Sequence, residues 1–419
     1  MNTPTVPRAQ ADTGTADNWV ARRSAATTGM YDRAVQAGLT GHTVTGRQGK
    51  TLTLDDGSRC VEFVSCSYLG LEDHPRMVHA VRTAVDAYGI HLSSSRNSMQ
   101  PAEAVELEEL LGQIYPGLHA LVFNSVSSVH LGLLPLLGAN VLPSYPVSPA
   151  GPLYVVERTA HASMQVLRGV LEQLGPVTRF TIQDPESLAA AMGAARASGR
   201  TPVILVDGIG SMGGLIDVAR LQETAERHGG YVYIDDAHGT SIDGPRGAGY
   251  AHVALGGQVP ANTLLVGSLS KAFGGSGGFV LTHAESDLHA LRREGNTMVF
   301  GHSNMVTHMA ANAESARMHL DGTVAALQAD LWAATALFDE LLAGANLVNS
   351  GTRSPIRGLA LESEEAAFAT AVRLREAGVL CFPVFYPIVA QGTGLLRFAL
   401  SSTHTPAQIK ELAALLGAV

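Results

Sequence analysis

Hydrophobic residues in the middle of the chain form short runs that alternate with stretches of helical periodicity. The runs that are typical of buried strands cover residues 120–123, 153–156, 202–207, 232–235, 263–266 and 278–281. Strands separated by helical stretches predict an α/β fold with a mostly parallel central sheet, flanked by helices and joined by right-handed crossovers. Because ligands of such sheets bind beyond the carboxyl ends of the strands, we expect the functional site at that edge.

The pattern changes on both sides of this central block. Before it, residues 49–63 alternate polar and apolar around an Asp-Asp-Gly turn, which predicts a hairpin that leads into a strand. Helical spacing follows at 75–90 and 102–114. After the block, an Ala-rich helical stretch runs from 306 to 342, which indicates a different kind of structure there.

The length of 419 residues also predicts more than one domain, since single cores stop growing at roughly 250–300 residues. We expect an N-terminal arm and small-domain segment at residues 1–60. A large ligand-binding domain is expected at 61–300, and a smaller C-terminal α/β domain at 301–419.

The composition excludes several classes of protein. Hydrophobic residues make up 46% of the chain and charged residues only 16%, so we expect a compact fold with little disorder. The net charge of −9 and the lack of a Lys/Arg cluster argue against a nucleic-acid partner. No apolar segment is long enough to span a membrane, and the N-terminal residues do not resemble a signal peptide.

The cysteines indicate the redox setting. Cys60, Cys66 and Cys381 are an odd number in a long chain and show no metal-binding spacing. This pattern favours reduced thiols and a cytoplasmic location over a disulfide framework, and it supports no metal site.

Polar residues follow the predicted strands at the expected edge of the sheet. Asp235 ends one strand, His238 follows it closely, and Lys271 follows another strand in a setting rich in Ser and Gly. These residue types suit pyridoxal phosphate (PLP). Its ring nitrogen needs a buried carboxylate to stay protonated, and its aldehyde needs a lysine amine for a Schiff base. The hydroxyls and backbone donors around Lys271 suit the phosphate.

Each of these features has a simpler interpretation when it stands alone. Asp-Asp-Ala-His is also typical of a solvated turn at a strand end, and a lysine near glycines is usually a surface residue. Residues 268–271 also match the Ser-x-x-Lys pattern of serine acylases. The companion motifs of those enzymes, Ser-Asp-Asn and Lys-Thr-Gly, are absent from the sequence, which disfavours an acylase.

Longer motifs narrow the choice. Asp-Asp-Ala-His-Gly-Thr at 235–240, Gly-Pro-Arg-Gly-Ala-Gly at 244–249 and Ser-Leu-Ser-Lys at 268–271 together resemble the α-oxoamine synthase family of fold-type I PLP transferases. That family includes 8-amino-7-oxononanoate synthase, glycine C-acetyltransferase, 5-aminolevulinate synthase, serine palmitoyltransferase and the aminoketone autoinducer synthases. The resemblance runs from about Val61 to the C-terminus.

The resemblance implies catalytic roles for four residues. Lys271 would hold the cofactor as a Schiff base and act as acid and base at the substrate α-carbon. Asp235 would pair with the ring nitrogen, and His238 would hydrogen-bond the phenolic oxygen of the cofactor. His161, in a Thr-Ala-His-Ala-Ser segment at 159–163, would stack on the cofactor ring.

Other positions are implied to bind the cofactor or the substrate. Ser211 would also hydrogen-bond the phenolic oxygen, and Ser268 would contact the phosphate. Arg397 would clamp the amino-acid carboxylate, because a guanidinium suits a bidentate contact. The loop that would cradle the phosphate from the other side consists of Ser125, Val126 and Ser127.

The chain departs from the family pattern in several places. Cys66 stands where many members have an Asn that helps to position the substrate. Residues 125–130 read Ser-Val-Ser-Ser-Val-His, where Ser-Gly-aromatic-Ala-Ala-Asn is common. Asp207 and Gly210 replace a common Glu and an aromatic residue, and Asp207 favours the autoinducer synthases within the family. Gly-His at 301–302 stands where members offer Ser-Thr to the phosphate of the partner subunit.

The hypothesis that follows is a decarboxylative Claisen-type condensation of an α-amino acid with an acyl thioester to an α-aminoketone. An aminotransferase on the same fold would use Asp235 and Lys271 in the same way, and a non-catalytic binding protein is the third hypothesis. The resemblance also implies a homodimer with active sites at the interface. The sequence identifies neither the amino acid nor the acyl donor, which would be acyl-CoA or an acyl-carrier protein.

Overall fold

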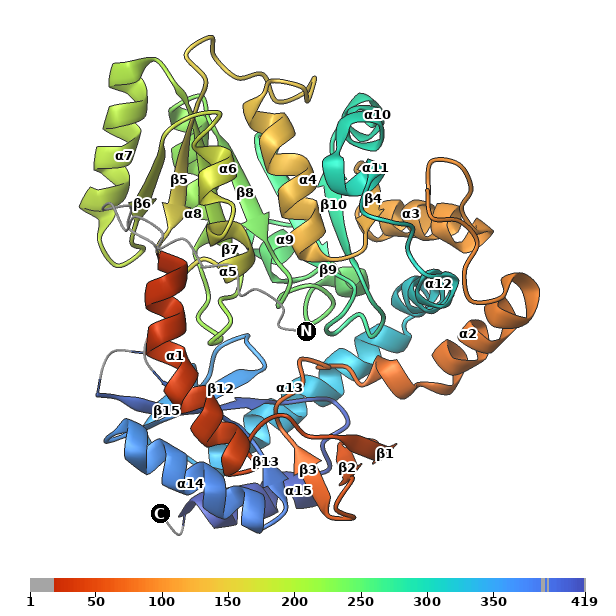
Figure 1. Cartoon of the computed structure of the whole chain (residues 1–419), viewed down its shortest axis with the longest axis vertical. Helices are drawn as coiled ribbons and strands as arrows, with labels where there is room; N and C mark the ends of the chain where they lie inside the picture. Colours follow the sequence, from red (N-terminus) through yellow and green to blue (C-terminus); the bar gives the residue numbers. More distant parts are fainter. Residues whose placement is uncertain (1–18, 386–388, 390–391, 418–419) are drawn as a thin grey trace, which may run out of the picture.

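A seven-stranded sheet forms the centre of the computed structural model (Figure 1), which describes residues 19–417 except 386–388 and 390–391. Its strands are β4 (His119–Phe123), β5 (Pro152–Glu157), β6 (Val177–Phe180), β7 (Thr201–Asp207), β8 (Tyr231–Asp235), β9 (Thr263–Ser268) and β10 (Gly278–Thr282). They lie in the order β4-β10-β9-β8-β7-β5-β6. The pairs from β6 to β9 are parallel, and β10 is antiparallel to both neighbours. The predicted α/β class with a mostly parallel central sheet is confirmed.

Successive side chains of these strands point to opposite faces of the sheet, and each face carries its own core. Ile204 and Val206 belong to one core, whereas Val203 and Leu205 belong to the other. The helices of the first core are α3 (Ala102–Ile114), α7 (Pro185–Ser198), α8 (Val218–Arg227), α9 (Tyr250–Ala254) and α12 (Val306–Leu320). Those of the second are α4 (Val126–Gly138), α5 (Ala162–Gln165), α6 (Arg168–Leu171), α10 (Glu285–Glu294) and α11 (Asn296–Val299). Because both faces are covered, the central strands are apolar throughout.

The strand β6 was not predicted. It reads Val-Thr-Arg-Phe, lies at the end of the sheet and buries only Phe180. A strand at the edge of a sheet needs no continuous apolar run, so the hydrophobic pattern does not reveal it.

The predicted helical stretch at 306–342 is two helices, α12 and α13 (Thr323–Leu341). Gly322 separates them with a φ of 93°, a left-handed conformation that glycine adopts without strain. As a result, α12 packs against α2 (Pro75–Tyr88) and α3 beside the large sheet, whereas α13 contacts α15 (Pro406–Gly417). The two helices thus lead the chain from the large sheet toward the smaller sheets (Figure 1).

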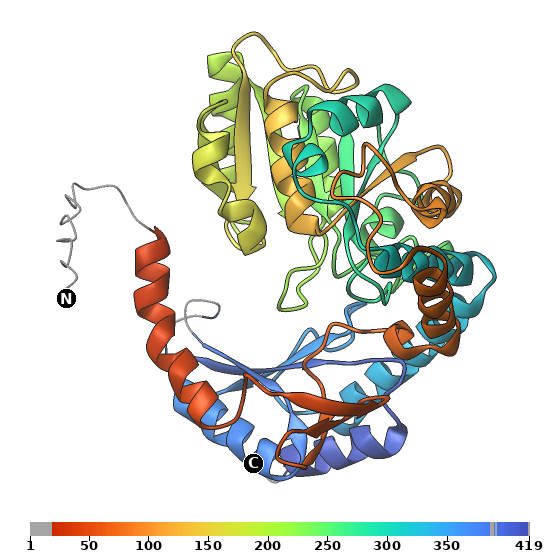
Figure 2. The same cartoon turned by 45° about the vertical axis from the view of Figure 1, so that its right-hand side comes forward.

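Two four-stranded sheets form the smaller part of the molecule. One consists of β1 (Val44–Gln48), β2 (Thr51–Leu54), β3 (Arg59–Glu62) and β13 (Val379–Leu380), and the other of β11 (Leu347–Val348), β12 (Ile356–Leu361), β15 (Gly394–Ala399) and β14 (Phe382–Val384). The hairpin predicted around the Asp-Asp-Gly turn is confirmed as β2 and β3. Because β13 pairs in parallel with β3, segments from both ends of the chain share this part (Figure 2). The domain boundaries near residues 60 and 300 stay predictions.

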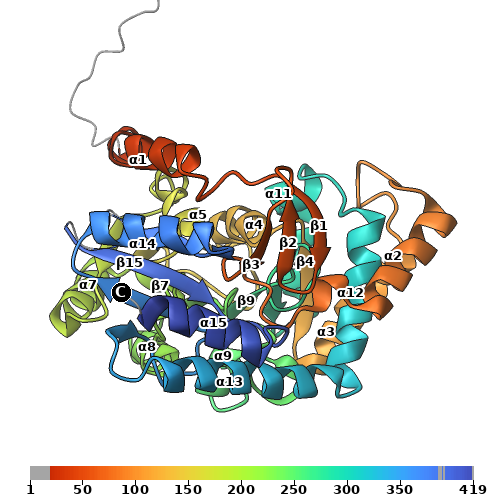
Figure 3. The same cartoon turned by 90° about the horizontal axis from the view of Figure 1, so that it is seen from below.

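The helix α1 (Trp19–Gln36) lies beside α14 (Glu364–Glu376), as Figure 3 shows from below. Arg33 Nη1 donates to Glu365 Oε2 at 2.7 Å, and its guanidinium lies 3.9 Å above the centre of the Phe368 ring. Short 3₁₀ turns are present as η1 (Leu71–Asp73) and η2 (Pro245–Gly247). None of the helices in the described part of the chain is both long and apolar enough to cross a membrane.

Candidate functional site

A cavity of about 210 Å³ lies where β7, β8 and β9 end, at the edge of the sheet that the sequence predicts for ligand binding. The residues that line it are Ser125, Val126, Ser127, His161, Ser163, Asp207, Ile209, Asp235, Ala237, His238, Ser268, Ser270 and Lys271. Of the predicted site residues, all except Cys66, Ser211 and Arg397 are among them. Segments that are far apart in the sequence therefore meet at one cavity.

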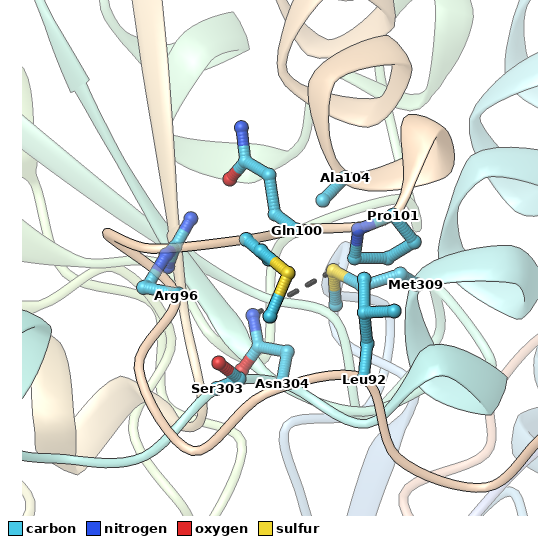
Figure 4. A pocket seen from close by; sticks show the side chains of 9 residues that line it. Leu92, Arg96, Gln100, Pro101, Ala104, Ser303, Asn304 and Met309 are labelled. Carbon is cyan, nitrogen blue, oxygen red and sulfur yellow. Dashed lines mark hydrogen bonds between the residues drawn. The ribbon is translucent and has the colours of Figure 1, made fainter. Parts of the chain in front are cut away.

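A second pocket lies between the loop after α2 and the start of α12 (Figure 4). Its free volume is about 10 Å³, which is room for about one water molecule. Figure 4 shows Asn304 and Met309 in contact there, and Nδ2 of Asn304 lies 3.6 Å from Sδ of Met309. The cavity at the strand ends, which is far larger, is therefore the candidate site.

Lys271 lines the cavity from a tight turn that follows β9. Gly274 in this turn has a φ of 81°, and a Cβ on it would lie only 2.4 Å from Cβ of Leu71, so the turn requires glycine. Burial lowers the pKa of Lys271, and the carboxylate of Asp235 opposes that shift. The amine loses its proton more readily than an exposed lysine does, which suits a nucleophile and a base.

The chain contains only three lysines, Lys50, Lys271 and Lys410. Lys50 is buried in an ion pair with Glu62, where Nζ and Oε1 are 2.9 Å apart. Lys410 is exposed on α15. Lys271 is therefore the lysine that can offer an amine to a ligand in the cavity.

Asp235 ends β8 with both carboxylate oxygens hydrogen-bonded. Oδ1 accepts a hydrogen bond from the backbone N–H of Ala237 at 3.0 Å, and Oδ2 lies 3.1 Å from Nε2 of His130. Burial on its own would raise the pKa of Asp235, but His130 and the charge of Lys271 outweigh burial and hold the pKa below its ordinary value. Asp235 is therefore the ionised carboxylate of the cavity.

Asp207 lies opposite Asp235 on the neighbouring strand β7, and its pKa is shifted in the other direction. Burial and the negative charge of Asp235 raise the pKa of Asp207 well above its ordinary value. Its Oδ1 accepts a hydrogen bond from the backbone N–H of His161 at 3.2 Å. Two adjacent carboxyl groups whose surroundings separate their pKa values in this way are typical of active sites.

His238 contacts the cavity on one side and Tyr68 on the other. The Tyr68 hydroxyl lies 2.7 Å from Nδ1 of His238. Burial raises the pKa of Tyr68 and lowers the pKa of His238, so the phenol keeps its proton and the imidazole is neutral. When Tyr68 donates in this contact, the ring proton of His238 is on Nε2, which makes that nitrogen a donor.

Serine hydroxyls and a helix start lie at another end of the cavity. Ser125 caps α4, and its Oγ accepts a hydrogen bond from the backbone N–H of Ser128 at 3.0 Å. Ser268 Oγ and Ser270 Oγ are 3.1 Å apart. A Cβ on Gly278 of β10 would lie 2.7 Å from the backbone nitrogen of Val126, so glycine lets the strand approach the helix start. The N-terminus of a helix with nearby hydroxyls favours a phosphate.

These groups fit PLP. Lys271 offers an amine for an aldehyde, and Asp235 offers an ionised carboxylate for a protonated ring nitrogen. The start of α4, with the serines beside it, offers donors for a phosphate. The chemistry of the three sets of groups matches the three polar parts of this cofactor.

Three predicted residues do not line the cavity, and one of them, Arg397, contacts the other two, Cys66 and Ser211. Arg397 Nε donates to the backbone carbonyl of Ser211 at 2.9 Å, and Nη2 lies 3.6 Å from Sγ of Cys66. Burial on its own would raise the pKa of Cys66, but the charges of Arg397 and Lys271 outweigh burial and lower it. The contact that the structure shows for Ser211 is made by its backbone, and its predicted hydroxyl contact with the cofactor stays a prediction.

Sequence reasoning assigned no role to His130 or Tyr68. His130 belongs to a segment that departs from the family pattern, and Tyr68 lies in the loop of Cys66. The signal for His130 was its position in the phosphate-loop segment, but its contacts with Asp235 and Tyr233 cross from a helix to a strand. Spacing along the chain does not reveal such contacts.

Comparisons with known proteins agree with this arrangement. A family model described as Aminotransferase class I and II matches residues 173–416. The 8-amino-7-oxononanoate synthase of Geobacter metallireducens is 30% identical over 380 residues, which cover 90% of this chain and 92% of that protein. The 2-amino-3-ketobutyrate coenzyme A ligase of Escherichia coli strain K12 is 27% identical over 371 residues, which cover 87% of this chain and 89% of that protein.

Solved structures show the same fold. A serine palmitoyltransferase from S. paucimobilis with bound PLP and myriocin has a TM-score of 0.82 at 22% identity, over 95% of this chain and 97% of that one. The serine palmitoyltransferase of Sphingomonas wittichii has a TM-score of 0.80 at 22% identity, over 96% of both chains.

Proposed function

Because the chain belongs to the α-oxoamine synthase family of PLP-dependent acyltransferases, we propose that it condenses an α-amino acid with an acyl thioester and releases an α-aminoketone. The observation that carries the proposal is the meeting of Lys271 and the ionised Asp235 at one cavity that a helix start also borders. We further propose that the amino acid loses its carboxylate in the reaction.

The names of the relatives support this class of product. Both 8-amino-7-oxononanoate and 2-amino-3-ketobutyrate carry an amino group on the carbon next to a ketone. The second compound keeps a carboxylate on its amino-bearing carbon, whereas the first does not. Loss of carboxylate therefore differs within the family, and it must be measured for this chain.

The bound cofactor supplies a positively charged, conjugated ring that accepts the electron pair left at the amino-acid α-carbon when its proton is removed. Asp235 contributes a fixed negative charge that favours the protonated ring nitrogen. His238 presents the N–H of Nε2 to the cavity, where it suits the phenolic oxygen of the cofactor. His161 comes from the loop after β5 and covers the ring.

Lys271 lines the cavity, and its amine would hold the cofactor through the aldehyde and would be free for acid–base work once a substrate amine replaced it. Because burial lowers the pKa of Lys271, the released amine is in its neutral form more often than an exposed lysine would be. It can then take the α-proton and return a proton to the product.

Arg397 holds the substrate carboxylate. Its guanidinium is anchored through Nε to Ser211 and lies beside Cys66 through Nη2, and its planar fork suits a carboxylate. Cys66 next to it replaces the longer amide that is common in the family. A smaller, polarisable side chain changes the room beside the carboxylate, so we propose that Cys66 affects how the amino acid is oriented.

We also propose a homodimer with active sites at the interface, in the cytoplasm. Cys60, Cys66 and Cys381 are free thiols in the structure, as a reducing compartment would keep them. The Gly301–His302 segment would contribute to the site of the partner. Within one chain, Nδ2 of Asn124 donates to the backbone carbonyls of Gly301 and His302 at 2.6 and 3.0 Å, which brings this segment close to the start of α4.

The test is product analysis with a panel of amino acids, each with a ¹³C-labelled carboxylate, and a panel of acyl-CoA and acyl-carrier-protein thioesters. We expect an aminoketone by mass spectrometry, together with equal amounts of free thiol and labelled carbon dioxide. Thiol release without labelled carbon dioxide would overturn the decarboxylative step alone. A 2-oxo acid without thiol release would assign the chain to the aminotransferases, and no turnover of any amine would favour a binding protein.

A further inference from the structure

His130 is a buried residue that the proposed reaction does not use. It lies on α4, its side chain has no exposed surface, and it faces β8. Nε2 lies 3.1 Å from Oδ2 of Asp235, and Nδ1 lies 2.6 Å from the Tyr233 hydroxyl. The three side chains form a row from the interior of the sheet to the carboxylate that lines the cavity.

The groups at the two ends of this row, Asp235 and Tyr233, indicate which atom donates in each hydrogen bond. Oδ2 of an ionised carboxylate only accepts, so Nε2 of His130 must donate. Burial raises the pKa of Tyr233 well above its ordinary value, so the phenol keeps its proton and is able to donate a hydrogen bond to Nδ1. In that arrangement the ring proton of His130 is on Nε2, and its N–H points at Asp235.

We propose that His130 is a positioning residue: held in one tautomer by Tyr233, it fixes the Asp235 carboxylate as the negatively charged acceptor for the ring nitrogen of the cofactor. The inference rests on the proposed function only through the cofactor, not through the substrates. Its test therefore measures cofactor binding by the apo-protein and needs no turnover.

Other charged and titratable groups also face Asp235, so His130 is not the only group that acts on its carboxylate. These groups are Asp207 on β7, Tyr233 on β8, Asp236 and His238 in the turn after β8, and Lys271 in the turn after β9. Lys271 acts on Asp235 through its charge, and its amine is the group that would hold the aldehyde. His130 is the neighbour of Oδ2 that would take no part in binding the ligand.

The test compares PLP with 1-deazapyridoxal phosphate, an analogue in which carbon replaces the ring nitrogen. His130→Phe keeps a planar ring but removes the donor. We expect the dissociation constant for PLP to rise about ten- to a hundredfold, as for the loss of a hydrogen bond to a charged group. The constant for the analogue should change less than threefold, because the analogue makes no use of the charge on Asp235.

Two further variants separate positioning from packing. Tyr233→Phe should weaken PLP binding in the same direction but less, since the tautomer is then no longer fixed. In an Asp235→Asn background, His130→Phe should add almost nothing, because both act on the same contact. His252→Phe is the matched control, because His252 is a buried histidine on α9 that packs on Tyr115, and it should leave both constants unchanged.

Each outcome decides the proposal. Equal weakening of PLP and of the analogue would mean that His130 only supports the packing of α4, and the proposal would be wrong. Full additivity with Asp235→Asn, or unchanged PLP binding in His130→Phe, would overturn it as well. If His130→Phe does not fold, His130→Leu, which also lacks a donor, and Tyr233→Phe carry the same comparison. Failure to find an acyl-thioester substrate would leave these results valid.

Discussion

The hydroxyl of Tyr68 lies 2.7 Å from Nδ1 of His238, although 170 residues separate the two in the chain. The contact joins the loop after β3 to the turn after β8. When Tyr68 donates in this contact, the ring proton of His238 is on Nε2, so Tyr68 can set which nitrogen of His238 carries the proton.

Tyr68→Phe should therefore weaken PLP binding about tenfold, since the tautomer of His238 is no longer fixed by a donor. Titration of the apo-protein with PLP, followed by absorbance, measures the change. Tyr154→Phe is the control, because its buried hydroxyl donates to the backbone carbonyl of Leu134 instead. Equal effects of the two variants on PLP binding would contradict the role of Tyr68.

Reduction of the PLP-loaded protein with borohydride should attach the cofactor to Lys271. Peptide mass spectrometry can compare all three lysines of the chain, with Lys50 and Lys410 as internal controls. Lys271→Ala should take up no label and should lose α-proton exchange by about a thousandfold or more, as for the loss of a general base. Label on another lysine would defeat the assignment of the site.

Arg397→Ala should raise KM for the amino acid about ten- to a hundredfold through the loss of a charge-assisted contact, with a smaller change in kcat. Arg397→Lys should restore little, because an ammonium cannot make the bidentate contact of a guanidinium. The matched control is Arg353→Ala, because Arg353 pairs with Asp243 at the surface. An unchanged KM in Arg397→Ala would remove this residue from the substrate site.

Mixing variants tests the predicted contribution of His302 to the partner. His302 has a φ of 70°, so His302→Gly removes the ring without backbone strain. If the His302 ring contacts the cofactor of the partner subunit, the His302→Gly protein should bind PLP weakly. A hybrid of one His302→Gly subunit and one Lys271→Ala subunit should then regain one native site, which combines Lys271 of the first subunit with His302 of the second. Hybrids whose sites all bind PLP as weakly as the parents would show that no subunit serves the other.

His319 should make the protein less stable in mild acid. Its ring contacts Ser241 and Ser315, and burial lowers its pKa to about 4 from the ordinary value of 6.5. At a pH between about 4 and 6.5, His319 carries a proton in the unfolded chain but not in the folded chain. The free energy of unfolding therefore falls as the pH falls, by about 2 kcal/mol between pH 7 and pH 5 from this group.

Urea titrations at the two pH values measure this contribution. His319→Phe should lose less stability on acidification than the natural protein does, whatever its stability at pH 7. The same substitution at the exposed His289 should leave the pH dependence nearly unchanged. An identical pH dependence in all three proteins would show that His319 takes up its proton equally in both states.

The sequence by itself determined the class of fold and the edge of the sheet at which the site lies. Strands covered on both faces must be apolar throughout, and parallel strands place their carboxyl ends at one edge. Asp235 and Lys271 could therefore be assigned to one place from their positions after two such strands. The same rule could not predict β6, because this edge strand buries only Phe180 and so carries no apolar run.

Only the tertiary structure decided which side chains act on these residues. His130 reaches Asp235 from a helix, Tyr68 reaches His238 from a loop, and Arg397 reaches Ser211 from the smaller part of the molecule. Such contacts depend on how separate elements pack, and packing is not encoded in spacing along the chain. The pKa values of Asp235 and Asp207 shift in opposite directions for the same reason, since they follow from burial and neighbours that the fold brings together.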